Sequence, residues 1–116
     1  MNKKSSFLSY LAVPYFDQNK FIVHERFEKV TKTAGQLLER GYKVYSPITH
    51  NHLINEQFNL NWKHKDWLDY DFLFLKQCKI LFVLKLEGWK ESLGVKREIE
   101  YAKKLGIKVK YIDYQR

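Results

Sequence analysis

Four short apolar runs along the chain predict β-strands. They cover residues 7–13, 42–45, 79–84 and 107–112. Pro14 follows the first run and the pair Ser46-Pro47 follows the second, as expected where a strand ends. The third run is apolar without alternation, which is typical of a strand that helices cover on both faces. The predicted sheet is therefore buried between layers of helix.

Apolar residues at helical spacing fill the longer stretches between these runs. They predict helices over residues 21–40, 62–77 and 92–105. Gly41 and Gly106 follow the first and the last of these helices, at the position where glycine commonly ends a helix. Residues 48–52 are interpreted as a loop, and residues 53–60 as a short helix despite the low helix propensity of their asparagines.

This alternation of strands and helices predicts the α/β fold class. Helical crossovers imply parallel strands, so we expect a doubly wound, flavodoxin- or Rossmann-like three-layer sandwich with a four-stranded parallel sheet of order 2-1-3-4. The 116 residues suit a single domain that spans residues 1–116. Ligands of such folds bind beyond the carboxyl ends of the strands, near the point where the strand order reverses. Functional side chains are therefore expected in the loops after the strands and at the helix starts.

One acidic side chain interrupts the apolar face of the helix predicted at residues 92–105. At about 100° per residue, Val95, Ile99, Ala102 and Leu105 fall on one arc. Glu98 lies within that arc. Because burial of an unpaired carboxylate is costly, either a partner satisfies Glu98 or a cavity opens beside it.

A second carboxylate lies on an apolar arc of the helix predicted at residues 62–77, where Asp71 shares a face with Leu68 and Leu75. Two carboxylates from different elements, each on an apolar face, are the pattern that divides into nucleophile and acid or orienting group in glycosyl transfer. Glu98 would attack an anomeric carbon, and Asp71 would assist the departing base or orient the attacker. The alternative is that both are carboxylates at the core edge, tied to backbone amides or to Tyr and Lys partners.

The start of the helix at residues 92–105 offers a second chemical feature. Ser92 can cap the helix, and Gly94 lets a ligand approach the backbone amides of the first turn. An anion site or a simple cap would both explain this pair. The chain has neither the phosphate-binding Gly-x4-Gly-Lys-Ser/Thr motif nor Gly-x-Gly-x-x-Gly after the first strand.

Composition and charge restrict the possible classes of binding partner only in part. The formal net charge of +8 suits nucleotides, nucleic acid or an acidic membrane surface, or a solvated basic surface without a partner. The 45% hydrophobic and 16% aromatic content favours a packed core. Cys78 is the only cysteine, so a buried, inert thiol in a cytoplasmic protein is the simplest interpretation. The N-terminus is basic, but only a short apolar run follows it, so neither a signal peptide nor a membrane span is expected.

The histidines and tryptophans give weaker indications. His24, His50, His52 and His64 lack the spacing of zinc ligands, and no metal or cofactor is expected. His50 and His52 lie in the loop predicted at residues 48–52, where exposure to solvent is the expected outcome. The tryptophans, Trp62, Trp67 and Trp89, would stack on a base or pack in the core or an interface.

Several short motifs resemble a known family in their order and spacing. They are Tyr10-Leu11-Ala12-Val13-Pro14-Tyr15, Gly41 with Val44 and Ser46-Pro47, Asp71 before the third strand, and Ser92-Leu93-Gly94-Val95 followed by Glu98-Ile99 and Tyr101-Ala102. Together they resemble the nucleoside 2-deoxyribosyltransferase-like superfamily over about residues 7–112. Gly88-Trp89 and the Ser-Leu-Gly-Val motif are most similar to its branch called domain of unknown function 1937.

This resemblance implies roles for individual residues. Glu98 matches the glutamate that attacks C1′ of a nucleoside sugar, Asp71 the catalytic aspartate, and Tyr10 a tyrosine that hydrogen-bonds the nucleophile. Ser92 stands where the transferases carry an aspartate that holds the 5′-hydroxyl. A neutral serine beside helix amides would accept a 5′-phosphate that an aspartate would repel. In this, Ser92-Leu93-Gly94 is similar to the deoxynucleoside 5′-monophosphate N-glycosidases of the superfamily.

The expected function is therefore an N-glycosidase that acts on a nucleoside 5′-monophosphate, with deoxyribosyl transfer to a second base as a side activity. Tyr15, His50 and Trp89 are expected to form pocket walls, and Arg26 or Lys20 to take the place of the relatives' phosphate-clamping loop. Because relatives form dimers, a homodimer is expected; a nucleic acid partner, which rests on charge alone, is not. The alternative function is a module of the same fold that binds a nucleotide or nucleotide-derived signal without cleaving it.

Overall fold

The computed structural model describes residues 6–116. Its strands are β1 (Leu8–Ala12), β2 (Lys43–Tyr45), β3 (Ile80–Leu84) and β4 (Lys108–Ile112). Its helices are α1 (Lys20–Glu39), α2 (Pro47–Gln57), α3 (His64–Leu75) and α4 (Leu93–Lys104). Residues 1–5, with most of the basic N-terminus for which no signal peptide is expected, lie outside the described residues.

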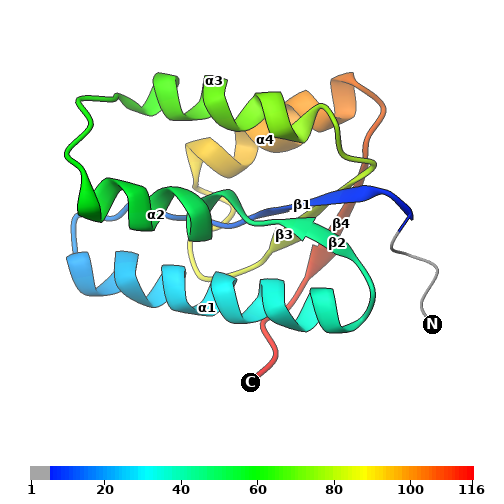
Figure 1. Ribbon diagram of the computed structural model, residues 1–116, viewed down its shortest axis with the longest axis horizontal. Coiled ribbons are helices and arrows are strands. Elements are labelled where there is room, and N and C mark those ends of the chain that lie inside the picture. Colours follow the sequence, from blue (N-terminus) through cyan, green and yellow to red (C-terminus); the bar gives the residue numbers. More distant parts are fainter. Residues whose placement is uncertain (1–5) are drawn as a thin grey trace.

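The strands form one parallel sheet in the order β2-β1-β3-β4, which confirms the predicted fold class and strand order. In Figure 1, α1 lies on one side of the sheet and α3 and α4 on the other, so the molecule has three layers. The strand order reverses between β1 and β3, and both strands end at the same edge. The carboxyl ends of β1 and β3 therefore mark the expected ligand site.

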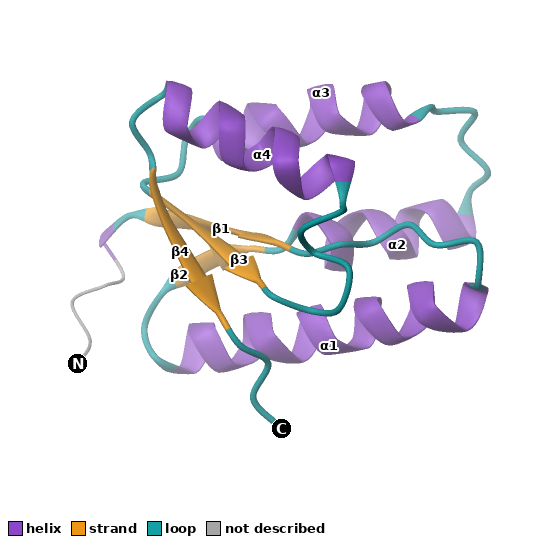
Figure 2. Cartoon of the chain, turned by 180° about the vertical axis from the view of Figure 1, so that it is seen from behind, coloured by secondary structure: helices purple, strands orange, loops and turns teal. Residues whose placement is uncertain are grey.

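Each face of the sheet packs against its own set of helices (Figure 2). Leu11 and Phe82 point to the side of α1, where Val30 and Leu37 cover them. The alternate residues of the same strands point to the side of α3 and α4, and Tyr10 and Leu81 are buried there. This alternation follows from the two-residue period of side chains along a strand.

The helix α2 differs from the prediction. Residues 48–52 were expected to be a loop, and this expectation is wrong because a helix runs over Pro47–Gln57. Pro47 occupies the first turn, where its fixed φ and missing N–H suit a helix start. The helix then packs beside α1, and the Thr31 and Thr49 hydroxyls are hydrogen-bonded at 2.8 Å. Contacts with the rest of the molecule therefore stabilise a helix whose own sequence favours one only weakly.

Helix ends agree with the prediction at two glycines and differ at one leucine. Gly41 and Gly106 follow α1 and α4 with φ of 97° and 76°, a conformation that glycine adopts without strain. Leu105 was expected on the buried arc of the last helix, but it caps α4 and is exposed. Among residues 6–116, no helix has both the length and the apolar character needed to cross a lipid bilayer.

Candidate active site

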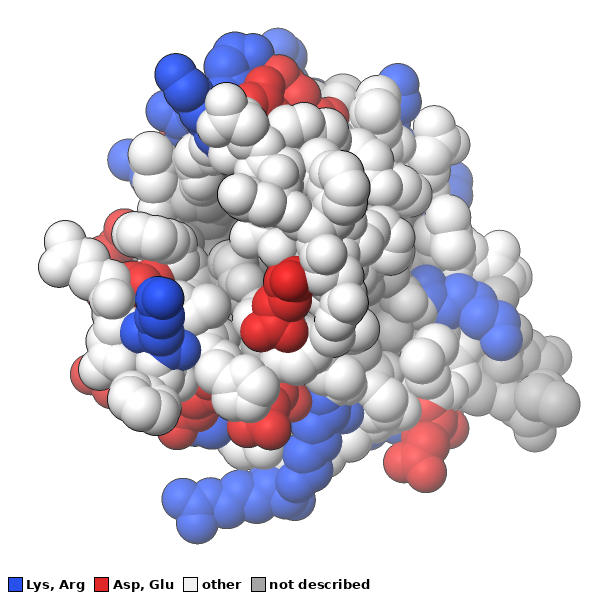
Figure 3. Space-filling model, turned by 60° about the vertical axis from the view of Figure 1, so that its left-hand side comes forward, with Lys and Arg blue, Asp and Glu red and all other residues white. Residues whose placement is uncertain are grey.

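A cavity of about 850 Å³ opens beyond the carboxyl ends of β1 and β3. The loop after β1, the helices α2 and α3, and the segment from Gly88 to the first turns of α4 line it. Figure 3 brings the corresponding side of the molecule forward, with Lys and Arg mostly around the periphery and mainly uncharged residues, together with acidic atoms, near the middle. The cavity lies in the volume range of small-molecule sites, roughly 300–1,000 Å³.

The two predicted carboxylates both line this cavity. Glu98 comes from α4 and Asp71 from α3, and each is only 6% exposed. Tyr10, fully buried in the middle of β1, donates a hydrogen bond of 2.5 Å from its hydroxyl to Oε2 of Glu98. Acidic groups 27 positions apart in the chain therefore share one cavity, and the predicted tyrosine contacts one of them.

Burial governs the proton affinity of Glu98. Loss of hydration, with a smaller contribution from the nearby Asp71 charge, raises its pKa to about 8. The hydrogen bond from Tyr10 opposes this shift because it stabilises the carboxylate. In turn, burial and the charges of Glu98 and Asp71 raise the pKa of the Tyr10 hydroxyl, which therefore stays a proton donor.

Asp71 has a partner that the sequence did not reveal. The Asn51 amide on α2 donates to Oδ1 of Asp71 at 2.8 Å, and Asn51 is itself buried. Burial raises the pKa of Asp71 to about 6, against the opposing effects of Asn51 and His50. Asn51 was missed because it lay in a predicted loop. Its only sequence signal is the Ser46-Pro47 pair, which can also mark the start of a helix.

The start of α4 also borders the cavity. The Ser92 hydroxyl accepts a hydrogen bond from the Val95 amide at 3.2 Å, so the predicted cap is present. Ser92 and Gly94 both line the cavity. A Cβ at Gly94 would lie 3.5 Å from Cε1 of His64, within ordinary contact distance. The helix tip and the two carboxylates therefore border one space, where the positive end of a helix dipole favours an anion.

Arg26 lines the cavity but has a bracing role as well. Its guanidinium donates to the Phe16 and Glu87 carbonyls, at 3.0 Å each. These bonds join the loop after β1 to the loop after β3. Gly88 has a φ of 91°, and a Cβ there would lie 2.9 Å from Nη2 of Arg26. Glycine at position 88 therefore permits both the turn and the arginine.

Tyr15 lines the cavity, as expected, and contacts a histidine that the sequence placed in solvent. Its hydroxyl is hydrogen-bonded to Nδ1 of His52 at 2.5 Å. His52 also lines the cavity, is 7% exposed and stacks on Phe27 with ring centres 4.0 Å apart. The expectation of a solvated His52 is therefore wrong, because α2 turns this side chain inward toward α1.

Two residues expected as pocket walls lie elsewhere. His50 is exposed on α2 and stacks on Tyr70. Trp89 packs against Tyr111 and against the buried cluster between the sheet and the helices α3 and α4. Neither is among the described residues that line the cavity. Trp62 and Trp67 do line the cavity, and their rings meet edge to face with ring centres 4.7 Å apart.

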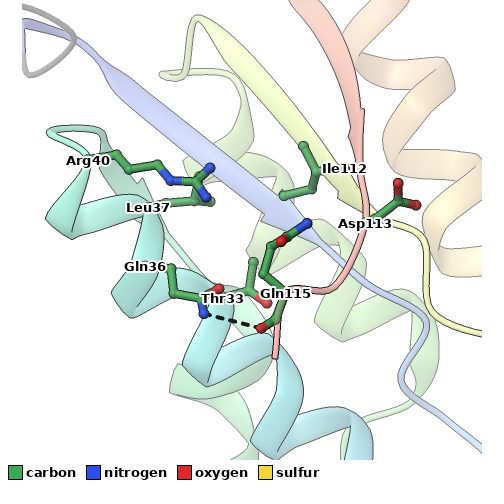
Figure 4. A pocket seen from close by; sticks show the side chains of 7 residues that line it. All are labelled: Thr33, Gln36, Leu37, Arg40, Ile112, Asp113 and Gln115. Carbon is green, nitrogen blue, oxygen red and sulfur yellow. Dashed lines mark hydrogen bonds between the residues drawn. The ribbon is translucent and has the colours of Figure 1, made fainter.

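A second, smaller hollow of about 170 Å³ lies between α1 and the chain at the end of β4 (Figure 4). It is lined by Thr33, Gln36, Leu37, Arg40, Ile112, Asp113 and Gln115. The Gln36 amide donates to the Gln115 carbonyl across it at 3.2 Å. Its volume falls below the usual range of small-molecule sites, and no buried carboxylate lines it.

Within residues 6–116, no group of three or more His, Cys, Asp or Glu side chains is placed to hold a metal ion. A comparison with known families matches residues 8–113 to the family described as "Domain of unknown function (DUF1937)". No curated protein matches the chain.

Proposed function

The chain belongs to this DUF1937 family, and we propose that it is an N-glycosidase that cleaves the bond between base and sugar of a nucleoside 5′-monophosphate. The observation that carries the proposal is the pair of buried carboxylates, Glu98 and Asp71, which line one cavity together with a helix start. Pairs of this kind divide into nucleophile and assisting group in glycosyl transfer.

Glu98 is the nucleophile in this proposal. Tyr10 holds Oε2, which leaves Oε1 to form a bond to C1′ while the bond from C1′ to the base nitrogen breaks and its electron pair leaves with the base. Water then attacks C1′ of the glycosyl-enzyme, and the bond from C1′ to Oε1 breaks with its electron pair returning to the carboxylate. The sugar phosphate leaves, and the water proton passes through solvent to the departed base anion. If a second base attacks in place of water, the result is deoxyribosyl transfer.

The pKa values assign a pH range to these roles. Glu98, with a pKa of about 8, is mostly protonated at neutral pH, and only its ionised form attacks. Asp71, with a pKa of about 6, is already ionised where Glu98 becomes reactive. Asp71 is therefore better suited to orient a sugar hydroxyl or water than to donate a proton. We expect kcat/KM to rise with pH up to about 8.

The start of α4 is the proposed binding site of the 5′-phosphate. Ser92 is neutral, and Gly94 keeps the first turn accessible from the cavity. Arg26 adds a positive charge to the lining of the same cavity, although two of its donors already bind carbonyl oxygens. The net charge of +8 also suits an anionic substrate.

We also infer membership of the nucleoside 2-deoxyribosyltransferase-like superfamily, a cytoplasmic location and a homodimer. Apolar side chains on elements that border the cavity support the dimer. They include Phe16, Phe21, Phe58, Trp62 and Leu93, all of which are exposed. A second subunit that covers them would remove apolar surface from water and narrow the cavity opening.

A second candidate is a module that binds a nucleotide without cleaving it. The raised pKa of Glu98 favours this reading, because a neutral carboxyl group at neutral pH binds a ligand but does not attack it.

Incubation with a panel of ribo- and deoxyribonucleoside 5′-monophosphates at pH 7–9, with chromatography of the free base, tests the proposal. We expect base release by the wild type and a decrease of about 10⁴-fold or more in Glu98→Ala, since the nucleophile is removed. The matched control is Glu100→Ala, which changes an exposed glutamate on the same helix. If no base is released and nucleotide binding survives Glu98→Ala, the binding module is correct and the glycosidase is not.

A further inference from the structure

Three polar side chains, each in contact with the next, lie where α2 and the loop after β1 form the cavity wall. The Tyr15 hydroxyl is bonded to Nδ1 of His52 at 2.5 Å, and Nε2 of His52 lies 3.4 Å from Oε2 of Glu56, one helical turn further along α2. Tyr15 and His52 line the cavity, whereas Glu56 is exposed. These three side chains therefore extend from the cavity to solvent.

The surroundings of His52 determine which atom donates and which accepts in its hydrogen bond with Tyr15. Nε2 is sealed from water and makes no hydrogen bond, but the Glu56 carboxylate lies 3.4 Å away, and its negative charge favours a proton on Nε2. On the side of α1, His52 meets the Phe27 ring and, at 6.2 Å between ring centres, His24. With the proton on Nε2, Nδ1 is an acceptor. Burial and the Glu56 charge raise the pKa of Tyr15 to about 12, so its hydroxyl keeps its proton and donates it to Nδ1.

This arrangement determines what Tyr15 can offer a ligand. A tyrosine hydroxyl has one proton and two lone pairs, and the proton is already committed to His52. Toward the cavity the hydroxyl therefore presents only acceptor capacity. A ligand group with N–H or O–H satisfies it, whereas a carbonyl oxygen at the same place would meet a second acceptor and leave both without a donor.

The position of this wall suggests which part of the ligand it meets. The proposed function puts the 5′-phosphate at Ser92 and Gly94 and the sugar at Glu98 and Asp71, so the base extends toward the remaining walls. We propose that the linked residues Glu56, His52 and Tyr15 select adenine and cytosine, which carry an amino group where hypoxanthine and uracil carry a keto oxygen, over these keto counterparts. This inference rests on the proposed function and adds its substrate preference. Tyr15 contacts the substrate, and His52 and Glu56 act through it as positioning residues.

The test measures binding and needs no turnover. Glu98→Gln blocks attack, and calorimetry in this background compares adenosine with inosine 5′-monophosphate and cytidine with uridine 5′-monophosphate, each pair also in its 2′-deoxy form. We expect the amino member of each pair to bind about 10-fold more tightly, as one hydrogen bond gained against one acceptor left unpaired implies. Adding His52→Phe keeps a ring against Phe27 but frees the Tyr15 proton. The ratio of the two dissociation constants within each pair should then fall to about one.

Two further variants separate a role in selection from a role in folding. Tyr15→Phe removes the acceptor itself, and it should also bring the ratio to about one. His50→Phe, an exposed histidine on the same helix, is the matched control and should keep the wild-type ratio. If His52→Phe and Tyr15→Phe weaken both members of a pair equally and keep their ratio, the role is structural and the inference is wrong.

The two levels of the proposal fail differently. Equal affinity for the two members of each pair, or tighter binding of the keto members, overturns the selection by Tyr15 and leaves the proposed function intact. If none of the nucleotides binds, the proposed function fails, and the selection fails with it.

Discussion

The two faces of the sheet are built from different kinds of side chain. Against α1 the buried cluster is hydrophobic and includes Leu11, Leu37 and the ring of Tyr42. Against α3 and α4 the cluster includes Tyr10, and the buried carboxyl groups of Glu98 and Asp71 lie beside it. Burial opposes the ionised form of both carboxylates, as their raised pKa values indicate. One face therefore stabilises the fold, while the other carries groups whose burial costs stability, as is common at functional sites.

The largest expected effect that would test this contrast is the pH dependence of stability caused by Glu98. Below about pH 4.5 its carboxyl group is protonated whether the chain is folded or unfolded, and between about 4.5 and 8 it is ionised only in the unfolded chain. The free energy of unfolding should therefore fall as pH rises through this range, by roughly 4–5 kcal/mol for a pKa difference of about 3.5.

Urea unfolding of wild type and Glu98→Gln from pH 5 to 9 measures this effect. The glutamine variant should gain stability relative to the wild type as pH rises, because its side chain does not ionise. Glu100→Gln, on the exposed side of α4, should follow the wild-type curve. Parallel curves for wild type and Glu98→Gln would mean that burial of Glu98 costs nothing, and the contrast between the two faces would be lost.

The next effect concerns the α1 face, where adjacent leucines differ in burial. Leu37 is 3% exposed in the apolar cluster, and Leu38 is 51% exposed. Leu37→Ala should lower the free energy of unfolding by about 2–5 kcal/mol, since it removes buried methyl groups and leaves a cavity. Leu38→Ala should cost less than about 1 kcal/mol. Thermal and urea unfolding measure both, and equal losses would contradict the assignment of the core.

The smallest expected effect concerns the hydrogen bond between Tyr10 and Glu98 on the α3 and α4 face, which can be removed without changing the packing of the ring. Tyr10→Phe keeps the buried ring but removes the donor to Glu98, so the pKa of Glu98 should rise by about one unit, about 1.4 kcal/mol. The acid limb of kcat/KM should move to higher pH by the same amount. Titration of the Glu98 carboxyl carbon by NMR checks the shift without reference to activity. An unchanged pKa would mean that the hydrogen bond does not stabilise the carboxylate.

Most of the fold could be predicted because local patterns report it directly. The continuous apolar run before α4 indicated a central strand, and Gly41 and Gly106 marked helix ends. Helical crossovers then restricted the sheet to parallel pairing. On α4, the interruption of an apolar arc by Glu98 indicated a carboxylate that needs a partner or a cavity, and the structure provides both in Tyr10 and the cavity.

The helix α2 could not be predicted in the same way. Its residues include β-branched side chains, histidines and asparagines, which have low helix propensity, and it lacks a clear apolar stripe. Its stability comes from packing beside α1, a contact between distant parts of the chain. Because α2 carries Asn51 and His52, the error extended to the partners of Asp71 and Tyr15.

The sequence by itself determined the parallel sheet, the helices of strong periodicity and the two carboxylates on apolar faces, because the period of side chains along a helix or strand is a local property. The tertiary structure alone decided which polar groups meet: Tyr10 with Glu98, Asn51 with Asp71, and His52 with Tyr15. These pairs join elements far apart in the chain. Their distances depend on how the layers pack, which no local pattern specifies.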